Sequence, residues 1–238
     1  MDAPRIIVIG AGPIGLETTA SLAGAGLDVT CIDGGPVGGT IYTLFPPATR
    51  FFSSPERIAI AGIDLQLPAQ EKATRDEYLA YLRGVVNTLG LRVHTFQTVI
   101  AARRTPPHWE IETVGRGGSR RSYHASHVVL AFGGTHSPRQ LAVPGEDLPH
   151  VDRFLGDPHR YFRRRVVIVG GKNSAAEAAL RCWRAGASVT LVHRGADLHE
   201  RIKYWIRPEL LSLIREGRVE ACFHSRVERI DSDEVVVA

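Results

Sequence analysis

The chain has 238 residues, is 44% hydrophobic and carries a formal net charge of +4 at pH 7. This length suits one large domain or two small domains with sizeable cores. Most of the 29 basic residues are arginines, and we interpret their one dense cluster, at 159–165, as a solvated linker that could otherwise bind an anion. No apolar run reaches membrane-spanning length. The composition therefore argues against a nucleic-acid-binding or membrane protein.

The three cysteines, Cys31, Cys182 and Cys222, show neither a C-x-x-C motif nor metal-ligand spacing. Without a disulfide framework, this usage fits a reducing compartment, and we expect a cytoplasmic protein with no metal site. We expect Cys31 and Cys182 to be small buried apolar side chains.

The most informative stretch begins with four apolar, β-branched residues at 6–9, which predict a buried parallel strand. It continues into Gly10-x-Gly12-x-x-Gly15 and a predicted helix at 16–25. In this motif Gly10 permits the tight turn, Gly12 lets the backbone approach a pyrophosphate, and Gly15 lets the helix pack close to the strand. The free amides at the helix start would bind the phosphates.

A second predicted strand, 28–33, ends in Asp33, whose carboxylate can accept hydrogen bonds from both ribose hydroxyls. Strand, Gly turn, helix and acid together predict a dinucleotide site rather than a purely structural turn. The Gly-rich segment 34–40 suits close backbone approach to the same ligand. The other residues predicted to contact it are Pro13, Ile14, Gly34, Gly39, Thr40, Val99, Ala131 and Gly133.

Between residues 42 and 131 the patterns predict several further elements. The aromatic stretch 42–52 is expected to be an ordered loop on a flat partner, or alternatively a local hydrophobic cluster. Thr74 and Glu77 form a capping box that begins a helix, which Gly90 ends. Strands at 97–103, 108–114 and 121–131 predict a β-meander before another parallel strand, which runs into a Gly-rich end at 131–135.

The opening pattern then recurs. A strand at 165–169 enters the turn 170–175, followed by a helix at 176–185 and a strand at 188–192. This repeat, about 160 residues apart, predicts an α/β fold of two Rossmann-like dinucleotide-binding domains. We place the first domain, with its meander, at 1–150, the linker at 151–163 and the second domain at 164–238.

The two units differ at the end of their second strand. The first ends in Asp33, whereas the second ends in His193 and Arg194, and an arginine can pair with the 2′-phosphate that a carboxylate would repel. We therefore expect FAD in the first unit and NADPH in the second. Lys203 is a weaker phosphate ligand whose alternative is a surface lysine. The residues predicted to contact NADPH are Gly170, Gly171, Lys172, Asn173, Ser174, Ala175, His193, Arg194 and Lys203.

Two nucleotide sites in one chain predict hydride transfer from NADPH to the flavin and onward to an acceptor. The cofactors carry this chemistry, so no catalytic side chain is assigned.

Several motifs resemble those of the bacillithiol-disulfide reductase (YpdA-type) flavoproteins, which are similar to thioredoxin reductase without its C-x-x-C. The resemblance covers essentially the whole chain and implies FAD, NADPH, a low-molecular-weight disulfide substrate, a cytoplasmic location and a homodimer. It also makes Lys172 a family feature. The motifs are the Gly10/Gly12/Gly15 turn, F-F-S-S-P-E-R at 51–57, D-P-H-R-Y-F at 157–162, G-G-K-N-S-A-A-E-A-A-L at 170–180, V-H-R-G at 192–195 and I-K-Y-W-I-R-P at 202–208.

Two departures from that family affect the expected activity. The position of its proposed nucleophilic cysteine is Ile14 here, which leaves the acceptor open between a disulfide, a quinone, ferredoxin and other compounds. The family also returns to its FAD domain after the NADPH domain, whereas this sequence ends in D-E-V-V-V-A, so we expect the second domain to be incomplete.

Two other functions stay open from the sequence. A flavin-dependent monooxygenase shares the two-nucleotide plan, although its F-x-G-x-x-x-H signature is one residue short between Phe154 and His159. A non-catalytic nucleotide-binding module is the other alternative.

Overall fold

The computed structural model describes residues 5–67, 71–135 and 138–238. The chain divides into two compact units, residues 1–137 and 138–238, and each is considered by itself. Among the helices of the described ranges, none is long and apolar enough to cross a membrane.

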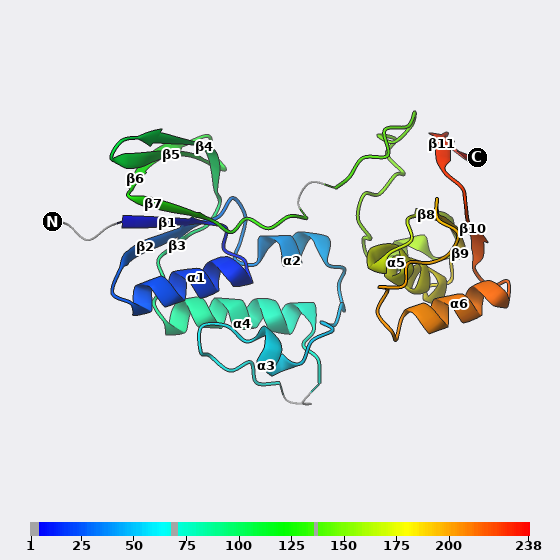
Figure 1. The fold of residues 1–238 in the computed structure, drawn as a ribbon, viewed down its shortest axis with the longest axis horizontal. Coiled ribbons are helices and arrows are strands. Elements are labelled where there is room, and N and C mark those ends of the chain that lie inside the picture. Colours follow the sequence, from blue (N-terminus) through cyan, green and yellow to red (C-terminus); the bar gives the residue numbers. More distant parts are fainter. Residues whose placement is uncertain (1–4, 68–70, 136–137) are drawn as a thin grey trace. The chain divides into compact units, whose positions relative to one another are not determined.

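The first unit is built on a four-stranded parallel sheet in the order β3-β2-β1-β7 (Figure 1). In this order β1 is an interior strand of the sheet. The last strand of the sheet in the sequence, β7, pairs with β1 on the side away from β2. Helices cover one face of the sheet, and a meander covers the other (Figure 1). The strands are β1 (Arg5–Ile9), β2 (Asp28–Ile32), β3 (Val93–His94) and β7 (His127–Leu130), and the helices are α1 (Pro13–Gly24), α2 (Gly39–Leu44), α3 (Pro55–Ile58) and α4 (Arg75–Thr88).

Strand β1 is buried on both faces, as its β-branched sequence predicted. Ile6 and Val8 pack among helical residues that include Leu16 and Leu82. Ile7, on the opposite face, packs against Ile111 of the meander. Because successive side chains of a strand point to opposite faces, an uninterrupted apolar run is what a doubly covered strand requires.

The meander consists of β4 (Gln97–Thr105), β5 (His108–Gly115) and β6 (Arg120–Ala125), paired antiparallel. The single strand predicted over 121–131 is wrong, because it is two strands in two different sheets. At the break, the Ser126 amide donates to the Arg5 carbonyl at 2.9 Å, and its hydroxyl donates to the same oxygen. The chain then continues as β7, parallel to β1.

The second unit holds a three-stranded parallel sheet in the order β10-β9-β8, and a hairpin of β11 and β12 follows it. Its core joins α5, α6 and β9 through Ala179, Leu210 and Leu191. The elements are 3-10 helix η1 (Pro158–Tyr161), β8 (Arg165–Val169), α5 (Asn173–Arg184), β9 (Ser188–Val192), α6 (Arg207–Arg215), β10 (Glu220–Cys222), β11 (Val227–Ile230) and β12 (Val235–Val237).

The internal repeat is confirmed. Strand β1, helix α1 and strand β2 correspond residue by residue to β8, α5 and β9. The strand registers also agree, since Arg5 lies opposite Asp28 and Arg165 lies opposite Ser188. Asp33 and His193 therefore hold the same place in the two units.

The predicted linker, 151–163, packs against the second unit. Val151 contacts the apolar cluster of Val227 and Ile230, and Tyr161 contacts the main core of this unit. The assignment of functional domains within these compact units stays a prediction.

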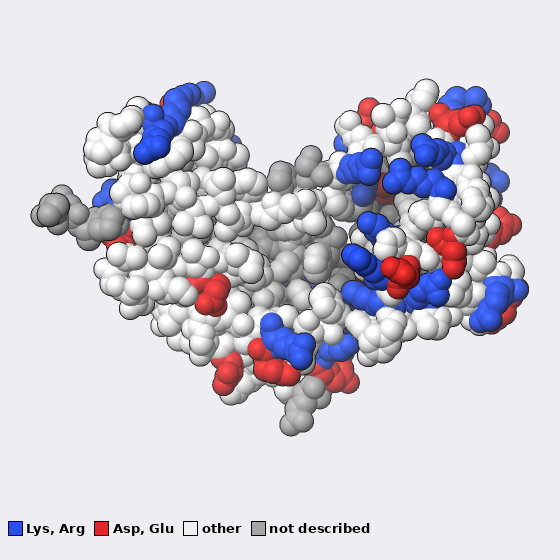
Figure 2. All heavy atoms as spheres, in the orientation of Figure 1, with Lys and Arg blue, Asp and Glu red and all other residues white. Residues whose placement is uncertain are grey.

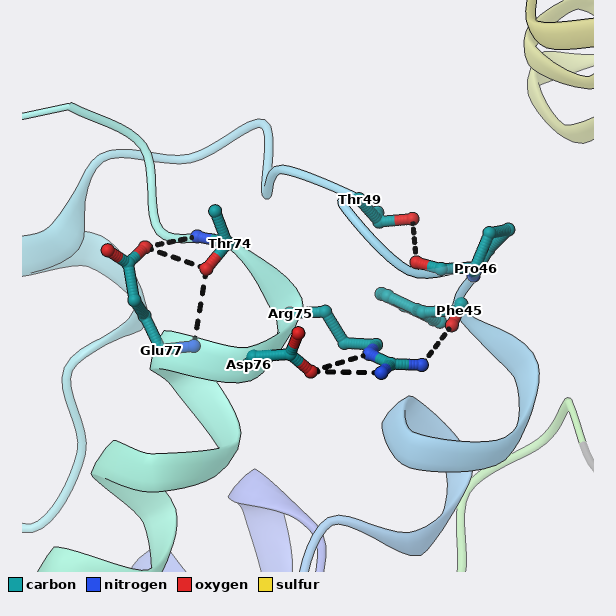
Figure 3. A network of polar contacts seen from close by, with 7 residues as sticks. All are labelled: Phe45, Pro46, Thr49, Thr74, Arg75, Asp76 and Glu77. Atoms are coloured by element: carbon teal, nitrogen blue, oxygen red, sulfur yellow. Dashed lines mark hydrogen bonds and ion pairs between the residues drawn. The ribbon is translucent and has the colours of Figure 1, made fainter. Parts of the chain in front are cut away.

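The aromatic stretch 42–52 is partly a short helix, α2, and partly a loop that packs on α4. Phe51 lies 4.6 Å, between ring centroids, from Tyr78 of α4, and Phe45 lies 5.7 Å from Phe51. Arg75, at the start of α4, donates to the Phe45 carbonyl at 3.1 Å (Figure 3). The hydrophobic cluster that was the alternative interpretation is therefore present for this part of the stretch.

The predicted capping box at the start of α4 is confirmed (Figure 3). The Thr74 hydroxyl accepts a hydrogen bond from the Glu77 amide at 3.2 Å, and the Glu77 carboxylate accepts one from the Thr74 amide at 2.8 Å. The Thr74 amide, together with the Thr74 hydroxyl that donates to the same carboxylate oxygen at 2.8 Å, holds the pKa of Glu77 below its usual range. Because the pKa is lowered by folding, this contribution to stability is present above the ordinary carboxyl pKa and is lost as the pH falls through the lowered value.

Replacement of the cap tests its contribution to the first unit. Thr74→Ala removes the hydroxyl acceptor and should lower the free energy of unfolding by about 1 kcal/mol. Thr88→Ala, at the exposed end of the same helix, is the matched control and should change it by less than about 0.5 kcal/mol. Urea denaturation followed by circular dichroism measures both, and equal losses would contradict the capping role.

Candidate functional site

The Gly turn of the first unit interlocks three backbone segments. Gly10 has φ +113°, and a Cβ there would lie within 3.0 Å of the Ala131 carbonyl at the end of β7. A Cβ at Gly15 would lie within 3.0 Å of the Gly10 carbonyl. The tight turn expected at Gly10 and the close helix–strand approach expected at Gly15 are therefore confirmed.

Gly12 differs from these two because, among the described residues and apart from its two chain neighbours, no atom lies within 4 Å of the place where its Cβ would be. It is the N-cap of α1, no side chain caps the helix, and its first turn holds no acidic residue. The amides of Ile14 and Gly15, in the first turn, have no acceptor within the helix and lie at its positive end. This arrangement fits a pyrophosphate, which needs close backbone approach and amide donors.

Asp33 is fixed beside this turn at the end of β2. Its two carboxylate oxygens accept hydrogen bonds from the Ala11 amide at 2.6 Å and from the Gly35 amide at 2.7 Å. Since each carboxylate oxygen has two lone pairs, both can still accept a ribose hydroxyl. The structure thus brings the Gly turn and Asp33 into direct contact, as the sequence predicted.

The other predicted residues of the first unit lie around the same carboxyl edge of the sheet. A Cβ at Gly34 would lie within 3.0 Å of the Thr98 hydroxyl, and Gly133 has φ +72°. Ile14, in the first turn of α1, is 72% exposed. Pro13 begins α1, and Gly39 and Thr40 begin α2. Val99, in β4 of the meander, packs on the apolar cluster that includes Ile7 and Ile9 of β1. The Ala131 amide donates to the Ile9 carbonyl at 2.8 Å.

Gly38 was missed by the sequence analysis. It has φ +68°, and its amide donates to the Ala11 carbonyl at 2.9 Å, so it holds α2 against the Gly turn. A Cβ there would also meet Leu79 of α4 within 3.0 Å. The signal was the Gly-Gly pair at 38–39, of which only the second member was assigned.

The second unit repeats the backbone of this turn. Gly170 has φ +147°, and its amide donates to the Val192 carbonyl at 3.0 Å. Lys172 is the exposed N-cap of α5, again without a side-chain cap and with no acidic residue in the first turn. Ser174 is exposed in that turn, and Ala175 takes the place of Gly15. These features fit phosphate binding at the start of α5.

The Asn173 side chain ties the segment 199–203 to this turn. Its amide oxygen accepts from the Lys203 backbone amide at 2.9 Å, and its nitrogen donates to the Arg201 carbonyl at 3.5 Å. The His199 amide donates to the Gly171 carbonyl at 3.0 Å. Lys203 thus lies next to the turn, with its ammonium 5.7 Å from the centre of the Trp205 ring.

At the end of β9, His193 is half-buried and Arg194 is exposed. Burial lowers the pKa of His193, and the neighbouring Arg194 and His199 lower it further. The second unit therefore presents a neutral imidazole and a guanidinium where the first presents a carboxylate. Many Lys and Arg side chains lie on the face of this unit that is shown in Figure 2.

The cysteines do not form a redox site in the described ranges. Burial raises the pKa of Cys31 to about 12 and that of Cys182 to about 11. The Cys31 thiol lies 3.4 Å from the Gly10 carbonyl, beneath the turn, and Cys222 is half-buried at the end of β10. In the same ranges no group of three or more His, Cys, Asp or Glu side chains could hold a metal ion.

Residues 7–238 match the pyridine nucleotide-disulphide oxidoreductase family. The chain belongs to this family. It is 36% identical over 98% of its length to bacilliredoxin reductase Bdr of Bacillus subtilis (strain 168), of which it covers 70%. The solved structure of bacillithiol disulfide reductase Bdr (YpdA) from Bacillus cereus superposes with a TM-score of 0.93 at 34% identity, over 99% of this chain and 74% of that one.

A third relative carries a different name. The chain is 29% identical to a ferredoxin--NADP reductase of Ignicoccus hospitalis, over 79% of this chain and 55% of that protein. The chain is a flavin-dependent oxidoreductase that uses FAD and NAD(P)H. The resemblance found in the sequence motifs is confirmed.

Thiol accessibility can be tested directly. In the native protein at pH 8, Cys31 and Cys182 should resist alkylation because they are buried and protonated. Cys222 should react first, since it is only half-buried. Iodoacetamide labelling followed by peptide mass spectrometry measures the three rates, with the urea-unfolded protein as the control in which all three react. Fast labelling of Cys31 in the folded protein would contradict this burial.

Proposed function

We propose that the first unit binds FAD, that the second binds NADPH, and that electrons pass to a low-molecular-weight disulfide in the cytoplasm. The observation that carries this proposal is the duplicated turn, whose two copies differ in charge where the second strand ends: Asp33 in the first unit, His193 and Arg194 in the second. The acceptor class is supported by the Bacillus relatives, whose names specify a bacilliredoxin and a bacillithiol disulfide.

The cofactors supply hydride transfer when bound, and the protein binds and orients them. In the first unit, the amides at the start of α1 receive the pyrophosphate, and Asp33 receives the adenosine ribose. In the second, the start of α5 with Lys172 receives the phosphates, and Arg194 receives the 2′-phosphate by charge-assisted hydrogen bonds.

A protein acceptor such as ferredoxin is the second candidate. It is favoured by Ile14, whose exposed side chain cannot form a mixed disulfide with a substrate, and by the ferredoxin--NADP reductase relative. Either acceptor uses the same two nucleotide sites, so the two candidates differ only in the final electron transfer.

Anaerobic reduction followed by reoxidation distinguishes these activities. NADPH should remove the yellow flavin absorbance of the FAD-loaded protein, and bacillithiol disulfide should restore it, whereas oxidised glutathione serves as a control disulfide. Restoration by ferredoxin alone would favour the second candidate. If NADPH leaves the flavin spectrum unchanged, neither function holds.

Asp33→Asn tests the first nucleotide site. The amide keeps one acceptor oxygen but loses the charge and one hydrogen bond, so FAD affinity should fall about tenfold or more. Asp64→Asn, an exposed residue of the same unit, should leave it unchanged. Titration of the flavin-free protein with FAD, followed by flavin fluorescence, measures both dissociation constants. Equal affinities in the two variants would remove Asp33 from the site.

A further inference from the structure

The two nucleotide turns differ in how the residue after the first glycine contacts the end of the second strand. In the first unit, the amide of Ala11 donates to the Asp33 carboxylate at 2.6 Å. In the second, Gly171 takes the place of Ala11, and the His193 imidazole lies against it. The Cε1, Nε2 and Cδ2 atoms of that ring all lie within 3.0 Å of the position that a Cβ on Gly171 would take.

A second glycine borders the same ring. A Cβ on Gly195 would also lie within 3.0 Å of the His193 Nε2 atom. Neither Gly171 nor Gly195 is among the residues with positive φ, whereas Gly170 is. The backbone conformation therefore does not require glycine at either position. Instead, the imidazole in its present position leaves no room for a Cβ at either of them.

We propose that Gly171 and Gly195 are positioning residues that seat the His193 ring against the turn, and that this seat selects a 2′-phosphorylated ribose. The inference rests on the proposed NADPH site and adds the reason for its preference. The His193 ring takes the place that the Asp33 carboxylate has in the first unit. The end of β9 therefore does not repel a phosphate, and it does not accept hydrogen bonds from the ribose hydroxyls as Asp33 can. Arg194, the next residue, then meets the phosphate at a fixed distance from the turn.

The first unit shows that a nucleotide turn of this kind tolerates a Cβ at the equivalent position, because Ala11 has one there and its neighbour is a short carboxylate. An alanine at position 171 should therefore act through His193 and not through the turn itself. The added methyl group would push the ring outward over the end of β9, into the space that the phosphorylated ribose needs. An unphosphorylated ribose, which does not depend on Arg194, should be less affected.

A double-mutant cycle tests this coupling. Wild type, Gly171→Ala, His193→Ala and the double variant are titrated with NADPH, NADH and adenosine 2′,5′-bisphosphate by isothermal calorimetry. Gly171→Ala should weaken NADPH and the bisphosphate about tenfold and NADH by less than about threefold. In the His193→Ala background the same change should have almost no effect, because the displaced ring is absent.

The reverse design is Gly171→Ala with His193→Asp, which rebuilds the Ala11–Asp33 pair in the second unit. It should shift the preference from NADPH towards NADH by about a hundredfold, more than His193→Asp alone. Gly84→Ala is the control for a glycine replacement, since Gly84 lies in α4 and, apart from its own helix backbone and chain neighbours, no described atom lies within 4 Å of the new Cβ. Thermal unfolding of every variant is the control that checks whether the fold persists.

The outcomes separate this inference from the proposed function. Equal losses of NADPH and NADH in Gly171→Ala, or losses that multiply independently in the double variant, would overturn the seat while leaving the NADPH site in place. A wild-type protein that binds neither nucleotide would overturn both. Preferential NADPH binding with the predicted coupling, but without flavin reduction, would support the seat and refute the enzymatic function.

Discussion

The first unit depends on the contact between the Gly turn, the start of α1 and the end of β7. Gly10 and Gly15 bring the turn and helix together, and Gly10 also touches the backbone at Ala131. A side chain at Gly10 would push the turn away from the end of β7, and one at Gly15 would push the helix away from the turn. Because the contact is made of backbone atoms, it fixes the free amides of α1 at the carboxyl edge of the sheet, beside β1 and β7. That is the crevice where parallel sheets of this class bind their ligands.

The second unit keeps this backbone and changes its chemistry. The register of β8 and β9 matches that of β1 and β2, and the turn amide at Gly170 makes the same strand contact as that at Gly10. What differs are side chains at the rim, where a carboxylate held by two amides is replaced by a neutral imidazole and an arginine. A duplicated scaffold can thus bind two nucleotides of different charge because ligand choice depends on few residues outside the core.

The sequence predicted the repeated parts of the fold well because their signals are local. A β-branched run, a glycine motif and a helical run of fixed length determine β1, α1 and β8 independently of distant contacts. The break at Ser126 was missed because no Gly or Pro marks it between residues 120 and 130, and only the tertiary bond to Arg5 reveals the change of sheet. The residue pattern was enough to predict that these residues form strands. Which sheet each strand joins depends on pairing with residues far away in the sequence.

The same distinction applies to the site. Asp33 and the glycines could be placed by spacing alone, since their roles depend on adjacent backbone. The Asn173 contact with the 199–203 segment and the fit of His193 between two glycines could not, because each joins residues about 20 to 30 positions apart through side-chain shape. Gly171 had been assigned only as a phosphate contact, and its packing role became visible when the ring position was known.

The position of Ile14 constrains how electrons can leave the first unit. A thiol relay requires a thiolate, whereas burial raises the pKa of Cys31 to about 12 and keeps its thiol protonated at pH 7. Cys31 also lies beneath the turn, with its sulfur directed to the Gly10 carbonyl, and Cys182 and Cys222 belong to the second unit. The first turn of α1 instead exposes an isoleucine, and Phe132, beside Gly10, is 50% exposed. Where FAD occupies this turn as proposed, an acceptor that reaches this edge meets the apolar side chains of Ile14 and Phe132.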